Sequence, residues 1–252
     1  MAATVPVRYE RMGAAALVTI DRPERRNAVD AATAELLRES LQRFEQDDDA
    51  RVMVLTGAGG VAFCAGADLK AMDLDIEHPQ GPMGFTRVAP SKPAIAAISG
   101  WCLAGGLEIA LWCDLRIATE DSTFGLFERR WGVPLIDGGT QRLPRVVGMG
   151  RALELTLTGR PVAAGEALRI GLANEIVAPG RHVERALELA EQLAGFPQET
   201  MLSDRRATIE GAGLPLRAGL QLEHRIGREV LDVAARGAAR FAGGEGRGGA
   251  GV

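Results

Sequence analysis

Two short glycine-bearing turns carry the residues of this sequence that are best suited to chemistry. The first runs from Phe63 to Leu69 and the second from Trp101 to Glu108, and each follows an apolar run typical of a β-strand. Small residues in such turns let backbone N–H groups approach a ligand closely. Two N–H groups aimed at one point form an oxyanion hole, which stabilises negative charge developing on a carbonyl oxygen. The pair of turns therefore favours chemistry at an activated carbonyl group.

Three acidic residues accompany these turns and could move protons. Glu108 falls in the first turn of a predicted helix with apolar neighbours, and a buried carboxylate needs partners or a catalytic task. Glu128 follows twenty residues later, where a surface ion pair with a neighbouring arginine is the alternative. Asp137 lies in a further glycine-rich turn, and it could also be a simple turn residue or helix N-cap.

Both turns also have a purely structural interpretation. Asp68 can accept hydrogen bonds from nearby backbone N–H groups, as it would in an ordinary tight turn. Gly105 and Gly106 could allow a helix to pack closely on a sheet. They could equally leave the N–H groups at the start of that helix open to a negatively charged oxygen. Local sequence alone leaves these alternatives open.

The composition argues against several other classes of function. The chain has 252 residues, of which 46% are hydrophobic and 25% charged, and its net charge of −4 provides no basic surface for nucleic acid. The three histidines lack metal-ligand spacing, so no metal site is expected. The three cysteines lie in apolar surroundings without CxxC spacing, which indicates reduced thiols and a cytoplasmic protein. No signal peptide and no run of membrane-spanning length are found.

The elements that must position these residues alternate between strands and helices. Because strands separated by helices need crossover connections, this order predicts an α/β fold with parallel pairing. Asp30 is predicted to cap the first long helix, and the irregular segment 72–88 to be a mobile loop over a pocket. Strands are expected at 5–10, 15–20, 51–55, 93–98 and 115–118, a buried helix at 107–115, and further helices at 151–157, 163–170, 182–193, 203–210 and 216–235.

Taken together, these segments resemble the crotonase superfamily, the enoyl-CoA hydratase/isomerase family. The resemblance extends in order from Val5 to Pro179. It implies a spiral of repeated ββα units over residues 1–195. It also implies a helical C-terminal region over 196–252 that forms homotrimers, often stacked as hexamers, with a disordered glycine-rich tail from about 243. The matching segments are 21–23 with 26–28, 63–69, 100–114, 124–128, 132, 138–144, 157–160 and 164–177.

The resemblance also implies a substrate and a mechanism. The substrate is an acyl-CoA thioester, and the oxyanion donors map to the N–H groups of Ala65 and Gly105. Glu108 would orient and activate a water molecule, and Glu128 would donate a proton to Cα. The expected function is that of an enoyl-CoA hydratase, a hydro-lyase of fatty acid β-oxidation that adds water across the 2,3 double bond of a trans-2-enoyl-CoA. No separate cofactor is expected, since coenzyme A is carried as part of the substrate.

The CoA-binding residues are likewise implied by the resemblance. Lys92 is a looser candidate, and each basic residue could instead be a solvated surface charge. The expected CoA contacts are Arg25, Arg26, Ala28, Ala65, Gly66, Ala67, Asp68, Leu69 and Lys70.

One segment departs from the usual hydratase pattern. Between Gly132 and Gly138 that pattern reads Ile-Pro-Gly-Ala, whereas this chain displaces the proline and adds Asp137. In some crotonases an acid near this point acts as nucleophile or base. Two alternatives therefore stay open. One is another crotonase-type reaction, by an isomerase, hydrolase, dehalogenase or decarboxylase, and the other is a non-catalytic acyl-CoA binder. Neither a nucleic acid nor a membrane is expected as a partner.

Overall fold

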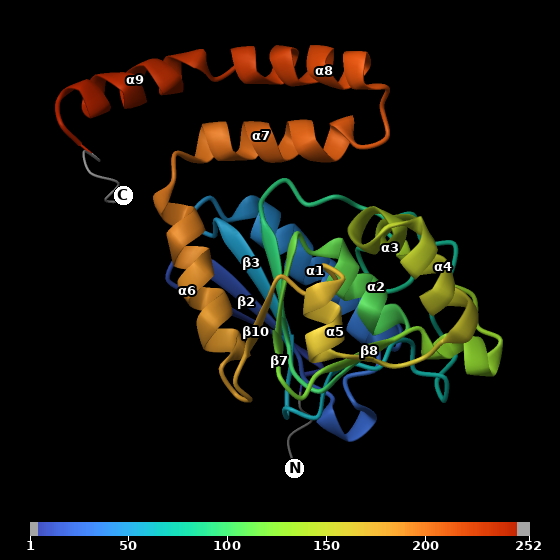
Figure 1. Ribbon diagram of the computed structural model, residues 1–252. Coiled ribbons are helices and arrows are strands. Elements are labelled where there is room, and N and C mark those ends of the chain that lie inside the picture. Colours follow the sequence, from blue (N-terminus) through green and yellow to red (C-terminus); the bar gives the residue numbers. More distant parts are fainter. Residues whose placement is uncertain (1–4, 246–252) are drawn as a thin grey trace. The chain divides into compact units, whose positions relative to one another are not determined.

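A computed structural model describes residues 5–245. The chain divides into two compact units, residues 1–191 and 192–252 (Figure 1). The first unit is built on two sheets. Its strands are β1 (Val7–Met12), β2 (Ala15–Ile20), β3 (Val52–Gly57), β4 (Ala62–Cys64), β5 (Ala94–Ile98), β6 (Trp101–Leu103), β7 (Leu115–Thr119), β8 (Thr123–Gly125), β9 (Val162–Ala163) and β10 (Glu175–Val177).

The order of the strands confirms the predicted α/β fold with parallel pairing. The larger sheet runs β1-β2-β3-β5-β7-β10, and its neighbours are parallel except for the β1–β2 hairpin. The smaller sheet runs β4-β6-β8-β9. Consecutive strands therefore alternate between sheets, since β3, β5 and β7 belong to the larger sheet while β4, β6 and β8 belong to the smaller one.

This alternation explains why the two glycine-bearing turns meet. Strands β4 and β6 are parallel neighbours, with Cys64 opposite Cys102. The carboxyl ends of parallel neighbours lie at the same edge of a sheet. The chain therefore leaves both strands at one place, and the turn that begins at Ala65 lies beside the one that begins at Ala104.

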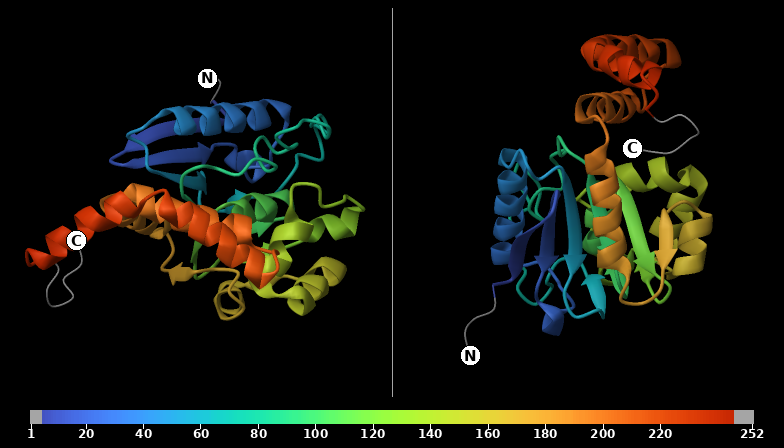
Figure 2. Two further views of the ribbon diagram at one scale, coloured as in Figure 1. Left: turned by 90° about the horizontal axis from the view of Figure 1, so that it is seen from above. Right: turned by 90° about the vertical axis from the view of Figure 1, so that its left-hand side faces the viewer.

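The helices cover the sheets for the reasons that their sequences indicate. The first long helix, α1 (Ala31–Gln46), begins as predicted at Asp30, whose side chain accepts a hydrogen bond from the Thr33 N–H at 2.9 Å. It lies along β1 and β2 and buries Leu37, Leu41 and Phe44 (Figure 2). The other helices of the first unit are η1 (Pro23–Arg25), α2 (Gly105–Trp112), η2 (Phe127–Trp131), α3 (Gly139–Val147), α4 (Met149–Thr158) and α5 (Ala164–Arg169), and α6 (His182–Gly195) begins there.

The C-terminal unit is helical, as the sequence predicts. Its helices are α7 (Gln198–Gly211), α8 (Leu216–Arg228) and α9 (Leu231–Ala242). Helices α7 and α8 pack side by side. The prediction of a single helix over 216–235 is wrong, because α8 ends at Arg228 and a separate helix, α9, begins at Leu231. Most of the predicted glycine-rich tail, residues 246–252, lies outside the described residues.

The short strands of the smaller sheet were not predicted. Strands β4, β6 and β8 have three residues each, which is too short for an alternating pattern to emerge. The segment 72–88 contains no helix or strand, as expected, but residues 81–86 are all buried. Met83 and Phe85 are nearly inaccessible to solvent, so this part of the loop belongs to the core.

Candidate active site

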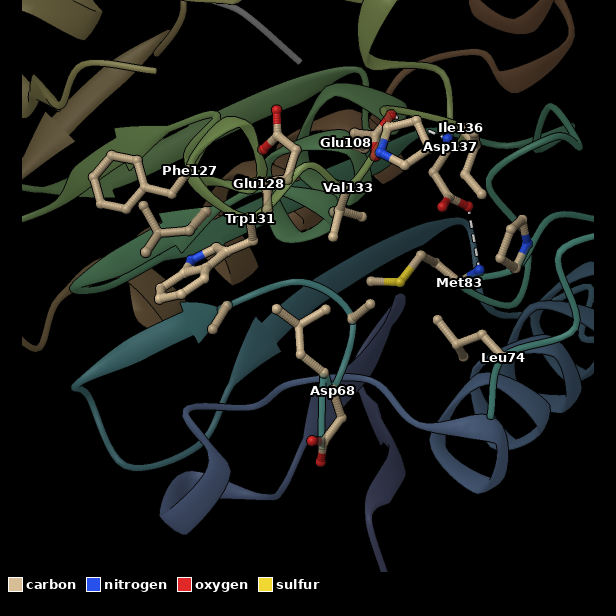
Figure 3. Close-up of a pocket in the computed structure, with 18 of the residues that line it drawn as sticks. Asp68, Leu74, Met83, Glu108, Phe127, Glu128, Trp131, Val133, Ile136 and Asp137 are labelled. Carbon is tan, nitrogen blue, oxygen red and sulfur yellow. Dashed lines mark hydrogen bonds between the residues drawn. The ribbon is translucent and has the colours of Figure 1, made fainter. Parts of the chain in front are cut away.

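One cavity of about 1030 Å³ in the first unit gathers most of the predicted site residues (Figure 3). The turn after β4, the start of α2, η2 and the segment 132–137 all contribute to it, and so does the loop 72–83. Figure 3 shows Asp68 across the cavity from Glu108, Glu128 and Asp137. Its apolar lining consists of Leu69, Met72, Leu74, Ile76, Pro82, Met83, Trp101, Leu103, Phe127, Trp131, Val133, Pro134 and Ile136.

The two glycine-bearing turns are in contact at the wall of this cavity. A Cβ atom added to Gly66 would lie 2.9 Å from the Gly105 nitrogen, so only a glycine allows the two backbones to approach this closely. The N–H groups of Ala67 and Gly105 have no hydrogen-bond acceptor within residues 5–245, and both residues line the cavity. Two adjacent residues of the cavity lining therefore carry unpaired backbone donors.

The structure corrects the assignment of Ala65 as one of these donors. The Ala65 N–H donates to the carbonyl oxygen of Arg26 at 3.1 Å and is not free to bind a ligand. The chain changes direction at Gly66, which has a φ of 93°, so the Ala65 N–H is paired with Arg26 while the Ala67 N–H has no acceptor within the described residues. Ala67 is the residue that sequence reasoning missed as a donor, although it lies in the predicted turn.

Gly105 and Gly106 have different surroundings in the structure. A Cβ on Gly106 would lie 2.1 Å from the carbonyl oxygen of Cys64, so Gly106 serves the close packing of α2 on β4. Gly105 is the first residue of α2 and faces the cavity. The residue before it, Ala104, has a φ of 51°, a strained conformation for alanine that is typical of functional turns.

Glu108 is held by backbone donors from a distant segment. The N–H groups of Asp137 and Gly139 donate to Glu108 Oε1 at 3.0 and 2.7 Å. The side chain is buried, with 3% exposure, and burial raises the pKa of Glu108 to about 7 from its usual 4.5. The two N–H donors oppose this rise, and the charges of Asp137 and Glu128 add to it. Glu108 is therefore a fixed carboxylate that can take up a proton near neutral pH.

Glu128 is buried without any such donors. Both of its carboxyl oxygens lack a hydrogen-bond partner within the described chain, and the residue is 5% exposed. Burial raises the pKa of Glu128, which favours the protonated acid. The alternative of a surface ion pair is wrong, because Arg129 donates to the Thr156 carbonyl oxygen and Arg130 stacks on the Phe127 ring.

Asp137 lies at the cavity as well, with only 4% exposure. Its Oδ1 accepts hydrogen bonds from the Met83 N–H at 3.2 Å and from the Thr86 hydroxyl. Burial raises the pKa of this carboxyl group. It does not cap α3, whose N-cap is Gly138 without a side-chain hydrogen bond. Asp137 therefore joins the segment 132–137 to the loop at 83–86.

The structure divides the predicted CoA-binding residues into two groups. Arg26, Ala65, Ala67, Asp68 and Leu69 line the cavity. The other residues lie outside its lining, and they are the exposed Arg25 and Lys70 and the buried Ala28 and Gly66.

The contacts of Asp68 agree with the structural interpretation, in which this residue stabilises a tight turn. Its Oδ1 accepts the Lys70 N–H at 3.1 Å, as predicted for a capping aspartate. Its Oδ2 forms an ion pair with Arg22 at 3.0 Å, and the same guanidinium lies 2.7 Å from Asp30. These contacts hold the turn against the start of α1.

Lys92 has a structural role rather than a place at the cavity. Its Nζ donates to the carbonyl oxygens of Phe44 at 2.5 Å and Asp47 at 3.0 Å, which are at the end of α1. It also lies 4.3 Å from the centre of the Phe44 ring. The ammonium group therefore satisfies terminal carbonyls of a helix.

Other parts of the lining were missed by sequence reasoning. Arg130 and the exposed Trp131, with 72% exposure, lie beside Glu128 in η2. The sequence carried no signal for either residue, because the exposure of Trp131 is known only from the structure. Within residues 5–245 no group of three potential metal ligands occurs. No helix there is both long and apolar enough to cross a membrane.

The family model described as enoyl-CoA hydratase/isomerase matches residues 10–242. The (E)-benzylidenesuccinyl-CoA hydratase of Thauera aromatica is 37% identical over 226 residues, which cover 87% of this chain and 88% of the relative. The "Probable enoyl-CoA hydratase" of Rhizobium meliloti (strain 1021) is 40% identical over 223 residues, 86% of each chain.

A solved structure supports the same relationship at the level of the fold. The crystal structure of enoyl-CoA hydratase EchA1 from Mycobacterium marinum matches with a TM-score of 0.90 and 35% sequence identity. The match covers 95% of this chain and 96% of that one. The expectation of a crotonase-like fold with a helical C-terminal region is confirmed.

Proposed function

Because this chain belongs to the enoyl-CoA hydratase/isomerase family, we propose that it is an enoyl-CoA hydratase, a hydro-lyase that adds water across the 2,3 double bond of a trans-2-enoyl-CoA. The observation that carries this proposal is the pairing of two unlike carboxyl groups in one cavity. Glu108 is fixed by two N–H donors, and Glu128 is buried without donors. Acid and base roles separate when two titratable groups lie in different environments.

The first part of the proposed mechanism is the polarisation of the thioester. The carbonyl oxygen of the substrate accepts hydrogen bonds from the N–H groups of Ala67 and Gly105, which are unpaired and face the cavity. These donors withdraw electron density from Cβ and stabilise the enolate. Loss of one such donor typically costs about 3 kcal/mol of transition-state stabilisation.

The second part is proton transfer. Glu108 accepts a proton from the water that attacks Cβ, since the pKa of about 7 makes it a stronger base than an ordinary glutamate. Its Oε1 is occupied by two N–H donors, which leaves Oε2 for the water. Glu128, whose pKa is raised by burial, donates a proton to Cα.

The CoA moiety is proposed to lie along the turn 65–69. Arg26 is exposed and lines the cavity, so its guanidinium is suited to a phosphate group, and the backbone of Ala67 to Leu69 is suited to the adenine and pantetheine. In this proposal coenzyme A enters as part of the substrate, and no further cofactor takes part in the reaction.

We also propose that the protein assembles as a homotrimer, or as a hexamer of two trimers, and that it works in the cytoplasm. Leu216, Leu220, Leu231 and Phe241 of the C-terminal unit are exposed, and exposed apolar clusters commonly mark interfaces. The three cysteines are free and buried, in agreement with a reducing compartment. Light scattering on the purified full chain tests the assembly, and a monomer would contradict it.

The test of the activity is a hydration assay. The protein is mixed with crotonyl-CoA and with longer trans-2-enoyl-CoA substrates, and loss of the enoyl absorbance is followed with identification of the 3-hydroxyacyl-CoA product. Hydration of at least one substrate is the expected result. Release of free CoA, isomerisation or decarboxylation without hydration would favour another reaction of the family, and CoA binding without turnover would favour a non-catalytic binder.

The reassignment of the oxyanion donor has its own test, because the Ala65 N–H is paired with Arg26 and the Ala67 N–H is unpaired. Replacing the amide of residue 67 by an ester removes the unpaired donor, and the expected fall in kcat is about 10²-fold. The matched control is the same replacement at residue 65, which removes the hydrogen bond to Arg26 and leaves kcat within about threefold. The reverse result would restore Ala65 as the donor.

A further inference from the structure

Asp137 is an acidic residue of the cavity, beside Glu108, for which the proposed mechanism has no use. Its carboxylate does not stand free in the cavity, because Oδ1 accepts the Met83 N–H and the Thr86 hydroxyl. Both partners are themselves 1% exposed, so the carboxylate is anchored in the core (Figure 3). Two donors on Oδ1 fix the orientation of the carboxylate and lower the nucleophilicity of that oxygen.

The backbone around Asp137 is what holds Glu108. Both donors to Glu108 Oε1 come from a span of three residues, since the N–H groups belong to Asp137 and Gly139. No other hydrogen bond to the Glu108 carboxylate is formed within the described residues. Whatever fixes the position of Asp137 therefore also fixes the orientation of Glu108.

Arg142, a residue of α3, connects the same two segments through its side chain. One of its guanidinium nitrogens donates to the Asp137 carbonyl oxygen at 2.9 Å, and another donates to the Thr86 carbonyl oxygen at 2.5 Å. The loop at 83–86 and the segment around Asp137 are thus joined twice, once through the Asp137 side chain and once through Arg142. Neither connection touches the Glu108 side chain directly.

We propose that Asp137 is a positioning residue, whose anchored carboxylate sets the orientation and the electrostatic surroundings of Glu108. This inference rests on the proposed hydratase function, in which Glu108 is the base. The carboxylate fixes the two N–H donors by tying their segment to Met83 and Thr86. Asp137 has two opposite effects on the pKa of Glu108. The negative charge of its side chain raises this pKa, and the hydrogen bond from its backbone N–H lowers it.

The other charges around this pair are few. Glu108 faces Asp137, Glu128 and Arg142, and Asp137 faces Arg87 and Arg142. The two arginines favour the ionised form of Asp137 and moderate the effect of burial. A single substitution, Asp137→Asn, can therefore remove the negative charge beside Glu108 without changing the shape of the site.

The first test needs no activity. Glutamate labelled with ¹³C at the side-chain carboxyl is introduced, and the Glu108 signal is assigned by its loss in Glu108→Gln. In Asp137→Asn, which keeps an oxygen acceptor and loses the charge, the pKa of Glu108 is expected to fall by about one unit. The matched control is Asp47→Asn, a remote acid paired with Arg11, which should leave the Glu108 titration unchanged. An unchanged titration in Asp137→Asn would overturn the proposal.

The second test compares two substitutions in the hydration assay. Asp137→Asn keeps the acceptor, so kcat is expected to fall by about three- to tenfold, and the acid limb of the pH profile should move to lower pH. Asp137→Ala also frees the segment, so kcat should fall by about 10²-fold. A loss of about 10⁴-fold in Asp137→Asn with an unmoved pH profile would show a direct chemical role instead.

A third variant keeps the proposal testable if both Asp137 substitutions fail to fold. Thr86→Val keeps the carboxylate and removes one anchor, and kcat is expected to fall several-fold with little change in KM. An unchanged kcat would contradict the positioning role. Failure of the proposed function would give a different result. The wild-type protein would then hydrate no enoyl-CoA, but Asp137→Asn would still shift the pKa of Glu108.

Discussion

The surroundings of Glu108 and Glu128 differ, although the two residues share one cavity. The N–H groups of Asp137 and Gly139, which are distant in sequence, both donate to one oxygen of Glu108. Around Glu128, in η2, both oxygens are buried and the chain supplies no donor. Burial raises the pKa of both residues, but only Glu108 has its orientation fixed by the backbone.

The difference shows how one residue type can be prepared for two tasks. Backbone donors stabilise the ionised form of Glu108 and counteract part of its burial, so it can exchange a proton near pH 7. For Glu128 the opposing effects are its own N–H group and the charge of Arg129, and burial outweighs both and raises the pKa.

Removing each carboxylic acid should have unequal effects on turnover. Glu128→Gln is expected to lower kcat for hydration by about 10⁴-fold, because the amide cannot donate the proton. Glu108→Gln is expected to lower kcat by about 10³-fold, since its carbonyl oxygen can still accept the two N–H donors and orient water. Stopped assays at saturating substrate measure both, with circular dichroism as the control for folding. Equal losses would contradict the proposed division of roles.

The backbone donors can be disturbed without changing either glutamate. A Cβ atom at Gly139 would lie 2.9 Å from Glu108 Oε1, so Gly139→Ala should displace the carboxylate and lower kcat by about 10²-fold. The matched control is Gly150→Ala, where a Cβ would meet no atom within 4 Å. Both variants are assayed together. Full activity of Gly139→Ala would mean that the fixed orientation of Glu108 is not needed.

The pH dependence of kcat/KM should show the ionisation of Glu108 and of Glu128 as two separate limbs. Glu108 must be ionised to accept a proton, so kcat/KM is expected to fall about tenfold per unit below a pH of about 7. In Glu108→Gln the remaining activity should lack this acid limb. Glu128 must be protonated, so the alkaline limb should persist in that variant. An acid limb that survives in Glu108→Gln would assign it to another group.

The smallest expected effect is on stability. The pKa of Glu108 is raised to about 7 from 4.5, so between these values the folded protein binds a proton that the unfolded chain has released. Stability therefore falls as the pH rises through this window, by about 3 kcal/mol in total. Glu108→Gln cannot ionise and should be more stable than the wild type at pH 8, but not at pH 4. Urea unfolding at the two pH values measures this, and the same difference at both would rule out the linkage.

Much of the fold and of the site could be predicted from sequence, and the errors have identifiable reasons. Asp30, the strand 15–20 and the buried helix with Glu108 carry strong local signals of capping and periodicity. The strands of the smaller sheet and the break between α8 and α9 lack such signals, because they depend on pairing and packing with distant residues. The donor was placed at Ala65 through the family resemblance, and no local pattern shows which N–H group of the turn stays unpaired beside a glycine with positive φ.

The sequence by itself determined the types and spacing of the reactive groups: two glycine-bearing turns, two glutamates twenty residues apart and an aspartate beyond them. Tertiary structure decided which of them act together. The parallel pairing of β4 with β6 brings Ala67 and Gly105 to one wall, and the return of the chain at 137–139 places donors on Glu108 but not on Glu128. The reason is physical, since hydrogen-bond direction and burial depend on neighbours that lie far away along the chain.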